Sequence, residues 1–300
     1  MLFSKWLLIV AELYLCMNNY EQHLQHLIKE ALQEDIGDGD HSTLSCISAT
    51  EMGKAVLKIK QDGILAGMTV AKTIFKMAEP SVVFTAFKND GDAVVYGDQA
   101  FTVEATVHTI LSCERLVLNC MQRMSGIATL THQYVQKLHG YHTCILDTRK
   151  TTPNFRLLEK EAVRNGGGVN HRYALYDMIM LKDNHIDFAG GIENAIGKAW
   201  DYVQTKKPNL KIEVETRNIA DVQTVLKCGQ GKVFRIMLDN FVPEQIAEAV
   251  QLINGAFETE ASGGINLSNI EEYAKAGVDY ISVGALTHQA QSLDLSLKAM

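Results

Sequence analysis

The second half of this 300-residue chain repeats short apolar runs at intervals of about 22 to 34 residues. Helical patterns separate most of these runs, over residues 192–203, 219–227, 243–253 and 269–276. A strand, a helix and another strand in this order build a parallel sheet, because the helix returns the chain to the edge where it started. The repetition predicts an α/β fold, and specifically an α/β barrel with fewer than the usual eight strands. The six predicted strands are residues 144–146, 178–181, 212–214, 234–238, 257–260 and 280–283.

The first part of the chain, up to about residue 126, has a different pattern of apolar residues. An apolar stripe at helical spacing follows Tyr20, and the glycine-rich residues 37–40 end it. Strands are predicted at 55–59, 82–87 and 101–107, and a long apolar helix from about 110 to beyond 121. This part should form a small α/β layer of mixed strands.

Charge and composition exclude two classes of partner. The formal net charge is −7, so the chain lacks the overall positive field that attracts nucleic acid or anionic lipid. Its six cysteines are scattered, with no zinc-like spacing, which is typical of reduced thiols in a cytoplasmic protein. The apolar run at 7–10 is too short to span a membrane. We expect residues 1–16 to be an extension outside the fold, from an upstream start, rather than a targeting segment.

Polar or glycine residues lie at the end of each of the six predicted strands. The carboxyl ends of the strands in an α/β barrel form one rim, where active sites lie, so these residues should converge on one site. The segments are 147–150, 182–185, 213–215, 239–240, 262–264 and 282–284.

Five basic side chains in these segments and just before the second strand would form a cationic cup. Arginine binds a carboxylate through a bidentate fork and lysine adds a point charge, so the cup suits a planar, multiply anionic ligand. The alternative is a solvated network of ion pairs with Glu159, Glu161 and Asp183. The five residues are Arg149, Lys150, His171, Arg172 and Lys182.

Three acidic residues predict a second group of side chains in the same site, opposite in charge to the cationic cup. Glu213 and Glu215 are two apart on one strand, so both side chains point to the same face. Pointing inward with Asp239, they could hold a divalent cation or ribose hydroxyls, or stabilise positive charge at a sugar carbon. A pair that faces the surface is the alternative.

Two serine-glycine turns follow the last two strands, Ser262-Gly263-Gly264 and Ser282-Val283-Gly284. Barrels commonly bind phosphate there through backbone N–H groups, which glycine allows to approach closely. The alternative is that each turn needs glycine only for its own geometry.

Several segments together resemble one family. They are Glu114-Arg115, Leu118-Asn119 and residues 125–129, 147–153, 166–172, 181–186, 237–240 and 260–264. These motifs resemble quinolinate phosphoribosyltransferase, also called nicotinate-nucleotide pyrophosphorylase (carboxylating), from about Tyr20 to the C-terminus. The sequence departs from the family pattern at Asn154, where glycine is usual, at residues 41–43, and in a lengthened segment at 228–232.

The resemblance implies a domain organisation and an assembly. An α/β sandwich domain would span residues 17–126 and an incomplete, about seven-stranded α/β barrel residues 127–286, with 287–300 returning to the first domain. A homodimer is implied, with Arg115 reaching the partner's site and higher oligomers left open. No nucleic acid and no membrane are expected as partners.

The resemblance also implies site residues and a cofactor. Lys150, Glu215 and Asp239 would be catalytic. Mg²⁺ would bind mainly through phosphoribosyl pyrophosphate (PRPP), with Glu215 and Asp239 as candidate ligands. The residues implied for quinolinate are Arg115, Arg149, His171, Arg172 and Lys182. Those implied for PRPP and its phosphates are Thr148, Lys150, Glu215, Asp239, Ser262, Gly263, Gly264, Ser282, Val283 and Gly284.

The expected reaction joins quinolinate to the ribose of PRPP with loss of carbon dioxide, in NAD biosynthesis. Three alternatives stay open at this point. One is a paralogous PRPP-dependent transferase for another anionic ring, and another is a lyase in which Lys150 or Lys182 forms a Schiff base. The third is a non-catalytic sensor that has kept the pocket.

Overall fold

A computed structural model describes residues 20–300, which divide into two compact units. The first unit holds residues 20–129, 152–166 and 290–300, and the second holds 130–151 and 167–289. This division groups residues 152–166 with the first unit, whereas the sequence analysis expects them within the barrel. The expectation of an extension at 1–16 lies outside the described residues.

The first unit is built on a four-stranded antiparallel sheet with the order β12-β1-β5-β3. β1 (Met52–Ile59) pairs along its length with β5 (Gln99–Thr106), and β5 pairs with β3 (Val83–Ala86). A separate pair joins β2 (Gly63–Ile64) to β4 (Ala93–Val94). The mixed α/β layer expected here is confirmed.

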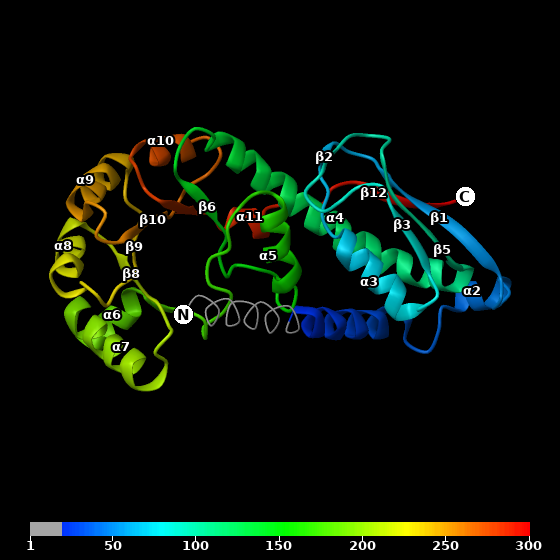
Figure 1. Cartoon of the computed structure of the whole chain (residues 1–300), viewed down its shortest axis with the longest axis horizontal. Helices are drawn as coiled ribbons and strands as arrows, with labels where there is room; N and C mark the ends of the chain where they lie inside the picture. The colour runs from blue at the N-terminus through cyan, green and yellow to red at the C-terminus, as the bar shows by residue number, and fades with distance from the viewer. Residues whose placement is uncertain (1–19) are drawn as a thin grey trace, which may run out of the picture. The chain divides into compact units, whose positions relative to one another are not determined.

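The last strand, β12 (Leu295–Ala299), comes from the end of the chain and pairs antiparallel with β1. Leu57 lies opposite Leu297 in this pairing, and both side chains are buried. The C-terminal residues therefore complete the sheet of the first unit (Figure 1).

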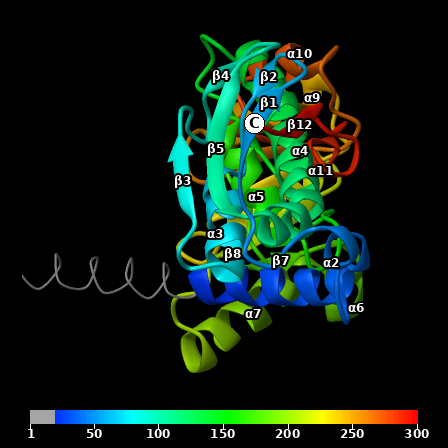
Figure 2. The same cartoon turned by 90° about the vertical axis from the view of Figure 1, so that its right-hand side faces the viewer.

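Helices cover this sheet on its apolar side. A helix over residues 20–36 is followed by α2 (His41–Cys46), α3 (Met68–Ala78) and the long α4 (Val107–Lys137), whose residues after 129 belong to the second unit. Phe75 on α3 contacts Phe84 and Phe101 with ring centroids 6.5 and 6.3 Å apart, and Phe84 stacks on Phe101 at 4.4 Å. This aromatic cluster fixes α3 against β3 and β5 (Figure 1 and Figure 2).

The second unit contains a parallel sheet of six strands, and all six strands predicted from the sequence are present. Their order is β6-β11-β10-β9-β8-β7, with an isolated parallel bridge between Leu146 on β6 and Val169. Closure into an incomplete barrel stays a prediction. The strands are β6 (Cys144–Leu146), β7 (Ile179–Leu181), β8 (Ile212–Thr216), β9 (Arg235–Asp239), β10 (Glu258–Ser262) and β11 (Tyr280–Ser282).

Helices alternate with these strands, as the repeated strand-helix pattern of the sequence predicts. α7, α8, α9 and α10 follow one another in contact and form an outer arc beside β8, β9 and β10 (Figure 1). The helices are α6 (Asp183–Ala189), α7 (Ile192–Lys206), α8 (Ile219–Cys228), α9 (Pro243–Ile253), α10 (Ile270–Lys275) and α11 (Ala285–His288).

The helix after β6, α5 (Arg156–Asn165), belongs to the first unit. Its Glu159 is fully buried and accepts hydrogen bonds from Arg123 at 2.8 and 3.0 Å. Asn154, just before α5, has φ 62°, a left-handed conformation that favours glycine or asparagine. Asparagine can therefore stand at a position where the resembling family usually has glycine.

No helix among residues 20–300 is both long enough and apolar enough to cross a membrane.

Two helical glycines, Gly126 in the first unit and Gly197 in the second, differ in how tightly their surroundings are packed. A side-chain carbon added at Gly126 on α4 would lie 2.0 Å from the Gln291 carbonyl oxygen, whereas one added at Gly197 on α7 would meet no atom within 4 Å. Gly126→Ala should therefore lower the free energy of unfolding by about 1–3 kcal/mol through overpacking. Gly197→Ala should raise it by about 0.5–1 kcal/mol through helix propensity. Urea unfolding followed by circular dichroism measures both, and stabilisation by Gly126→Ala would contradict the packing described.

Candidate active site

A cavity of about 510 Å³ opens in the second unit where the carboxyl ends of the parallel strands meet. This volume suits a small-molecule ligand. Its lining contains ten of the residues that the sequence analysis places in the site, and five more. The residues are Asp147, Thr148, Arg149, Lys150, His171, Arg172, Met180, Lys182, Asp183, Glu215, Met237, Asp239, Glu260, Ser262 and Ser282.

Besides Glu213, five predicted site residues do not line this cavity. Arg115 is exposed on α4 in the first unit. Val283 is buried, and its backbone N–H donates to Leu146 at 3.0 Å. The three glycines of the two turns also lie outside the lining. They are Gly263, Gly264 and Gly284.

Two of these three glycines nevertheless have close neighbours. A side-chain carbon at Gly263, where φ is 98°, would lie 2.2 Å from the Asn240 side-chain oxygen. One at Gly284 would lie 3.0 Å from the Lys150 side chain and 3.1 Å from His288 Nε2. Gly284 thus lets two basic side chains approach the backbone of α11. His288 carries no signal that the sequence analysis used.

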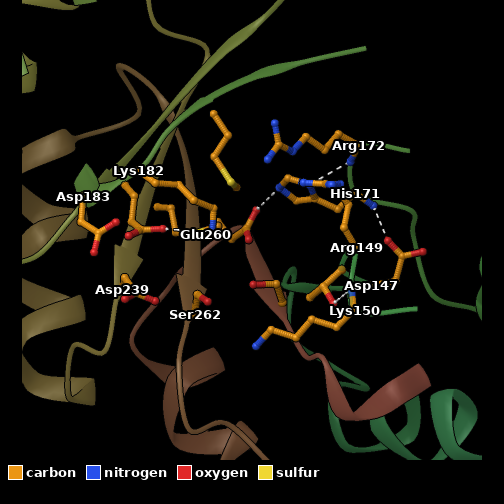
Figure 3. A pocket seen from close by; sticks show the side chains of 15 residues that line it. Asp147, Arg149, Lys150, His171, Arg172, Lys182, Asp183, Asp239, Glu260 and Ser262 are labelled. Carbon is orange, nitrogen blue, oxygen red and sulfur yellow. Dashed lines mark hydrogen bonds and ion pairs between the residues drawn. The ribbon is translucent and has the colours of Figure 1, made fainter. Parts of the chain in front are cut away.

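The basic residues form the cup that the sequence analysis predicts, without the alternative network of ion pairs to Glu159 and Glu161. Glu159 binds Arg123, and Glu161 accepts a hydrogen bond from Tyr20. Arg149, Lys150 and Arg172 lie across the cavity from Lys182 and Asp239 (Figure 3). Among residues 20–300, Arg149 Nε is one of the few buried side-chain nitrogens without a hydrogen-bond partner.

Glu215 and Asp239 lie at the ends of the neighbouring strands β8 and β9. Burial raises the pKa of Glu215, Lys182 lowers it, and the charge of Asp239 raises it. Lys182 Nζ lies 3.6 Å from Glu215. Two carboxylates close enough to repel one another form a donor set of the kind that Mg²⁺ binds.

Below the cavity, Glu213 faces inward with Glu215, so the surface-facing alternative is wrong. Glu213 is fully buried and lies 2.9 Å from His171 Nε2, with Glu260 at 3.3 Å from the same nitrogen. Arg235 donates to Glu260 at 3.0 Å and to Glu258 at 2.8 Å. Sequence analysis missed Glu260 and Arg235 as site residues. The position of Glu260, two before Ser262 on the same strand face, was the available signal.

Burial and close neighbours shift the pKa values of His171 and Glu213. Burial lowers the pKa of His171, and its hydrogen bonds to Glu213 and Glu260 raise it. Burial and the charge of Glu260 raise the pKa of Glu213 to about 7. The Arg172 backbone N–H donates to His171 Nδ1 at 2.8 Å, on the side of the ring away from Glu213 and Glu260.

The ligand atoms of His171, Glu213 and Glu260 lie within 4.8 Å of one another, a spacing that a metal ion could also use. Arg235 already supplies positive charge to this cluster. We therefore interpret the cluster as a closed ion-pair network, and Glu215 with Asp239 as the better site for a cation.

Removal of the buried guanidinium tests this interpretation. Arg235→Met should lower the free energy of unfolding by about 3–5 kcal/mol, because it leaves buried carboxylate charge without its partner. Arg235→Met combined with Glu260→Gln should recover much of that loss. Urea unfolding of the two variants near neutral pH measures the difference. Equal stability of the single and double variants would show that the Arg235–Glu260 pair is not the cause.

Comparison with known proteins identifies the family. The N-terminal domain of quinolinate phosphoribosyl transferase matches residues 40–125, and its C-terminal domain matches residues 127–298. A quinolinate phosphoribosyltransferase [decarboxylating] of Nicotiana tabacum is 46% identical over 288 residues, covering 92% of this chain and 82% of that protein. A probable nicotinate-nucleotide pyrophosphorylase [carboxylating] of Synechocystis is 41% identical, covering 90% of each.

A solved structure agrees. The crystal structure of NadC from Streptococcus pyogenes superposes with a TM-score of 0.86 at 40% identity, covering 92% of this chain and 97% of that one. Both domain models match in order, and the sheet and cavity of the second unit lie within the matched C-terminal domain. This protein belongs to the quinolinate phosphoribosyltransferase family.

Proposed function

We propose that this protein transfers the phosphoribosyl group of PRPP to quinolinate, releasing pyrophosphate and carbon dioxide and forming nicotinate mononucleotide for NAD biosynthesis. The observation that carries the proposal is the charge layout of one cavity. Four cations line it together with Glu215 and Asp239, as two polyanionic substrates and a developing ribose cation require.

Arg149, Arg172 and Lys182 are the proposed ligands of the quinolinate carboxylates. The buried, unpartnered Nε of Arg149 supports this role, because a carboxylate would supply the missing acceptor. Two methionines, Met180 and Met237, also line the cavity and offer an apolar surface to a flat ring.

The phosphates of PRPP are proposed to bind at the other wall. Lys150 supplies a point charge there, and its backbone oxygen accepts the Thr287 hydroxyl at 2.9 Å, which fixes the loop. Thr148, Ser262 and Ser282 line the same cavity. Backbone N–H groups of the turns at 263–264 and 283–284 would complete the phosphate contacts.

In the proposed reaction the pyridine nitrogen attacks ribose C1 as the bond from C1 to pyrophosphate breaks. Glu215 and Asp239 stabilise the positive charge that C1 develops. The nitrogen becomes cationic and accepts the electron pair released when the bond between ring carbon 2 and its carboxylate breaks. Carbon dioxide leaves, and a proton from water takes its place. Holding the two substrates side by side in the reactive orientation can lower the activation free energy by about 7–11 kcal/mol.

Mg²⁺ is the proposed cofactor, held mainly by PRPP with Glu215 and Asp239 as protein ligands. The carboxylate pair fits this ion, because Mg²⁺ binds through one or two carboxylates and substrate phosphates. When bound, it would offset charge on the departing pyrophosphate.

A cytoplasmic location is also a proposal. It rests on scattered thiols, and the five described cysteines are all free. Relatives from rice and Arabidopsis are named chloroplastic, and others from Nicotiana are named mitochondrial.

Arg149→Ala should lower kcat/KM for quinolinate by about a hundredfold or more, because it removes a charged contact from a buried site. Arg217→Ala is the matched control, since Arg217 follows β8 at the same end of the sheet, is exposed, and does not line the cavity. The control should stay within about twofold of wild type. The assay contains quinolinate, PRPP and Mg²⁺ and follows nicotinate mononucleotide and carbon dioxide together. Near-normal turnover by a folded Arg149→Ala protein would rule out the proposed substrate cup.

The proposed homodimer completes each site with Arg115 of the partner, which makes subunit mixing a test. Arg115→Ala and Arg149→Ala proteins should each be nearly inactive alone. Unfolded, mixed in equal amounts and refolded, they should recover about one quarter of wild-type activity, because half the dimers are mixed and each has one intact site. Mixing wild type with Arg149→Ala controls for refolding yield. No recovery in the mixture would contradict a shared site.

A further inference from the structure

Asp147, a fully buried residue directly after β6, holds the backbone segment that carries Arg172. Asp147 accepts the His171 backbone N–H at 2.8 Å and the Asn170 side-chain amide at 2.6 Å. A buried carboxylate that accepts from one backbone N–H and one side-chain amide forms strong hydrogen bonds, so this segment is fixed to the sheet.

The ring of His171 is held at both nitrogens by other parts of the protein. Nδ1 accepts the backbone N–H of Arg172 at 2.8 Å, and Nε2 lies 2.9 Å from Glu213 and 3.3 Å from Glu260. Figure 3 shows the ring turned toward Glu260, beside Arg172 and above Asp147. A ring held in this way fixes the backbone at Arg172 and has both hydrogen-bonding atoms engaged.

Arg172 needs this support because it lies close to another cation. Burial and the positive charge of Arg149 both lower the pKa of Arg172. Repulsion between the two guanidinium groups pushes them apart when no anion lies between them. Arg172 Nη1 donates to the Met178 carbonyl oxygen at 3.0 Å, which holds the outer end of the side chain while His171 holds its backbone.

We propose that His171 and Asp147 are positioning residues that hold Arg172 for a substrate carboxylate, and that the ring nitrogens of His171 do not bind the substrate. This assignment differs from the ligand role that the family resemblance implies for His171. It rests on the proposed function for the identity of the anionic substrate.

A double-mutant cycle separates positioning from direct contact. His171→Gln keeps a donor directed at Glu213 and Glu260 but removes the acceptor for the Arg172 N–H. It should weaken quinolinate binding about tenfold in the otherwise wild-type protein, as expected when an oriented contact of a charged group is lost. In the Arg172→Ala background the same change should alter the dissociation constant by less than about twofold, because the group it positions is already gone.

His171→Asn is the matched control, since its side-chain oxygen can take the place of Nδ1. It should bind quinolinate more tightly than His171→Gln. Titration calorimetry with quinolinate and, separately, with PRPP measures all variants, and PRPP affinity should not change. Similar losses from His171→Gln in both backgrounds, or tighter binding by Gln than by Asn, would overturn the proposal. So would an equal loss of PRPP affinity, which indicates general disruption.

Hydrogen exchange provides a readout that does not depend on the substrate. In His171→Gln the Arg172 amide should exchange faster than in wild type, and in His171→Asn it should stay protected. If wild type fails to bind quinolinate, the proposed function is wrong, and the exchange rates still decide the positioning role. An Arg172 amide that exchanges equally in wild type and His171→Gln would overturn that role.

Discussion

The parallel hydrogen-bond ladder from β6 to β7 brings side chains from six distant parts of the chain to one end of a sheet. Its register pairs Ser262 with Asp239 on the adjacent strand, and Glu215 with Met237. A shift of β8 by one residue would turn Glu213 and Glu215 to the opposite face of the sheet. The cavity wall would then lose Glu215, and the buried cluster would lose Glu213. The Glu215–Asp239 pair and the network beneath it therefore depend on one register.

Buried charge is the main energetic cost of this arrangement. Glu213 and Glu260 lie inside the sheet, where an isolated carboxylate would be strongly destabilised. Arg235 offsets that cost through its ion pair with Glu260 and stacks over the Tyr280 ring, with its guanidinium carbon 4.2 Å from the centroid. Apolar residues in place of Glu213 and Glu260 would need no ion pair to offset the cost of burial. They could not, however, hold the His171 ring in one orientation.

The strands and the cup could be predicted from the sequence because their signals are local. Apolar runs mark the strands, and Arg149, Lys150 and Lys182 follow them directly. The grouping of α5 with the first unit could not be predicted, because it depends on contacts such as Arg123–Glu159 between residues 36 positions apart. Glu260 was missed for a related reason. Its spacing to Ser262 places it on the cavity side of β10, but its partners His171 and Arg235 come from other segments, and no local pattern predicts those contacts.

The proximity of Arg149 to Arg172 links folding to ligand binding. Arginine side chains carry a positive charge in proteins, so the repulsion between these two is a cost of the unliganded fold. The buried anchors Asp147 and His171 hold the segment in place against it. A ligand with two adjacent carboxylates would remove this repulsion and add charge-assisted hydrogen bonds at once. Because the arginines are already in position, little of that gain is lost to ordering flexible side chains, and a ligand with one carboxylate would recover only part of it.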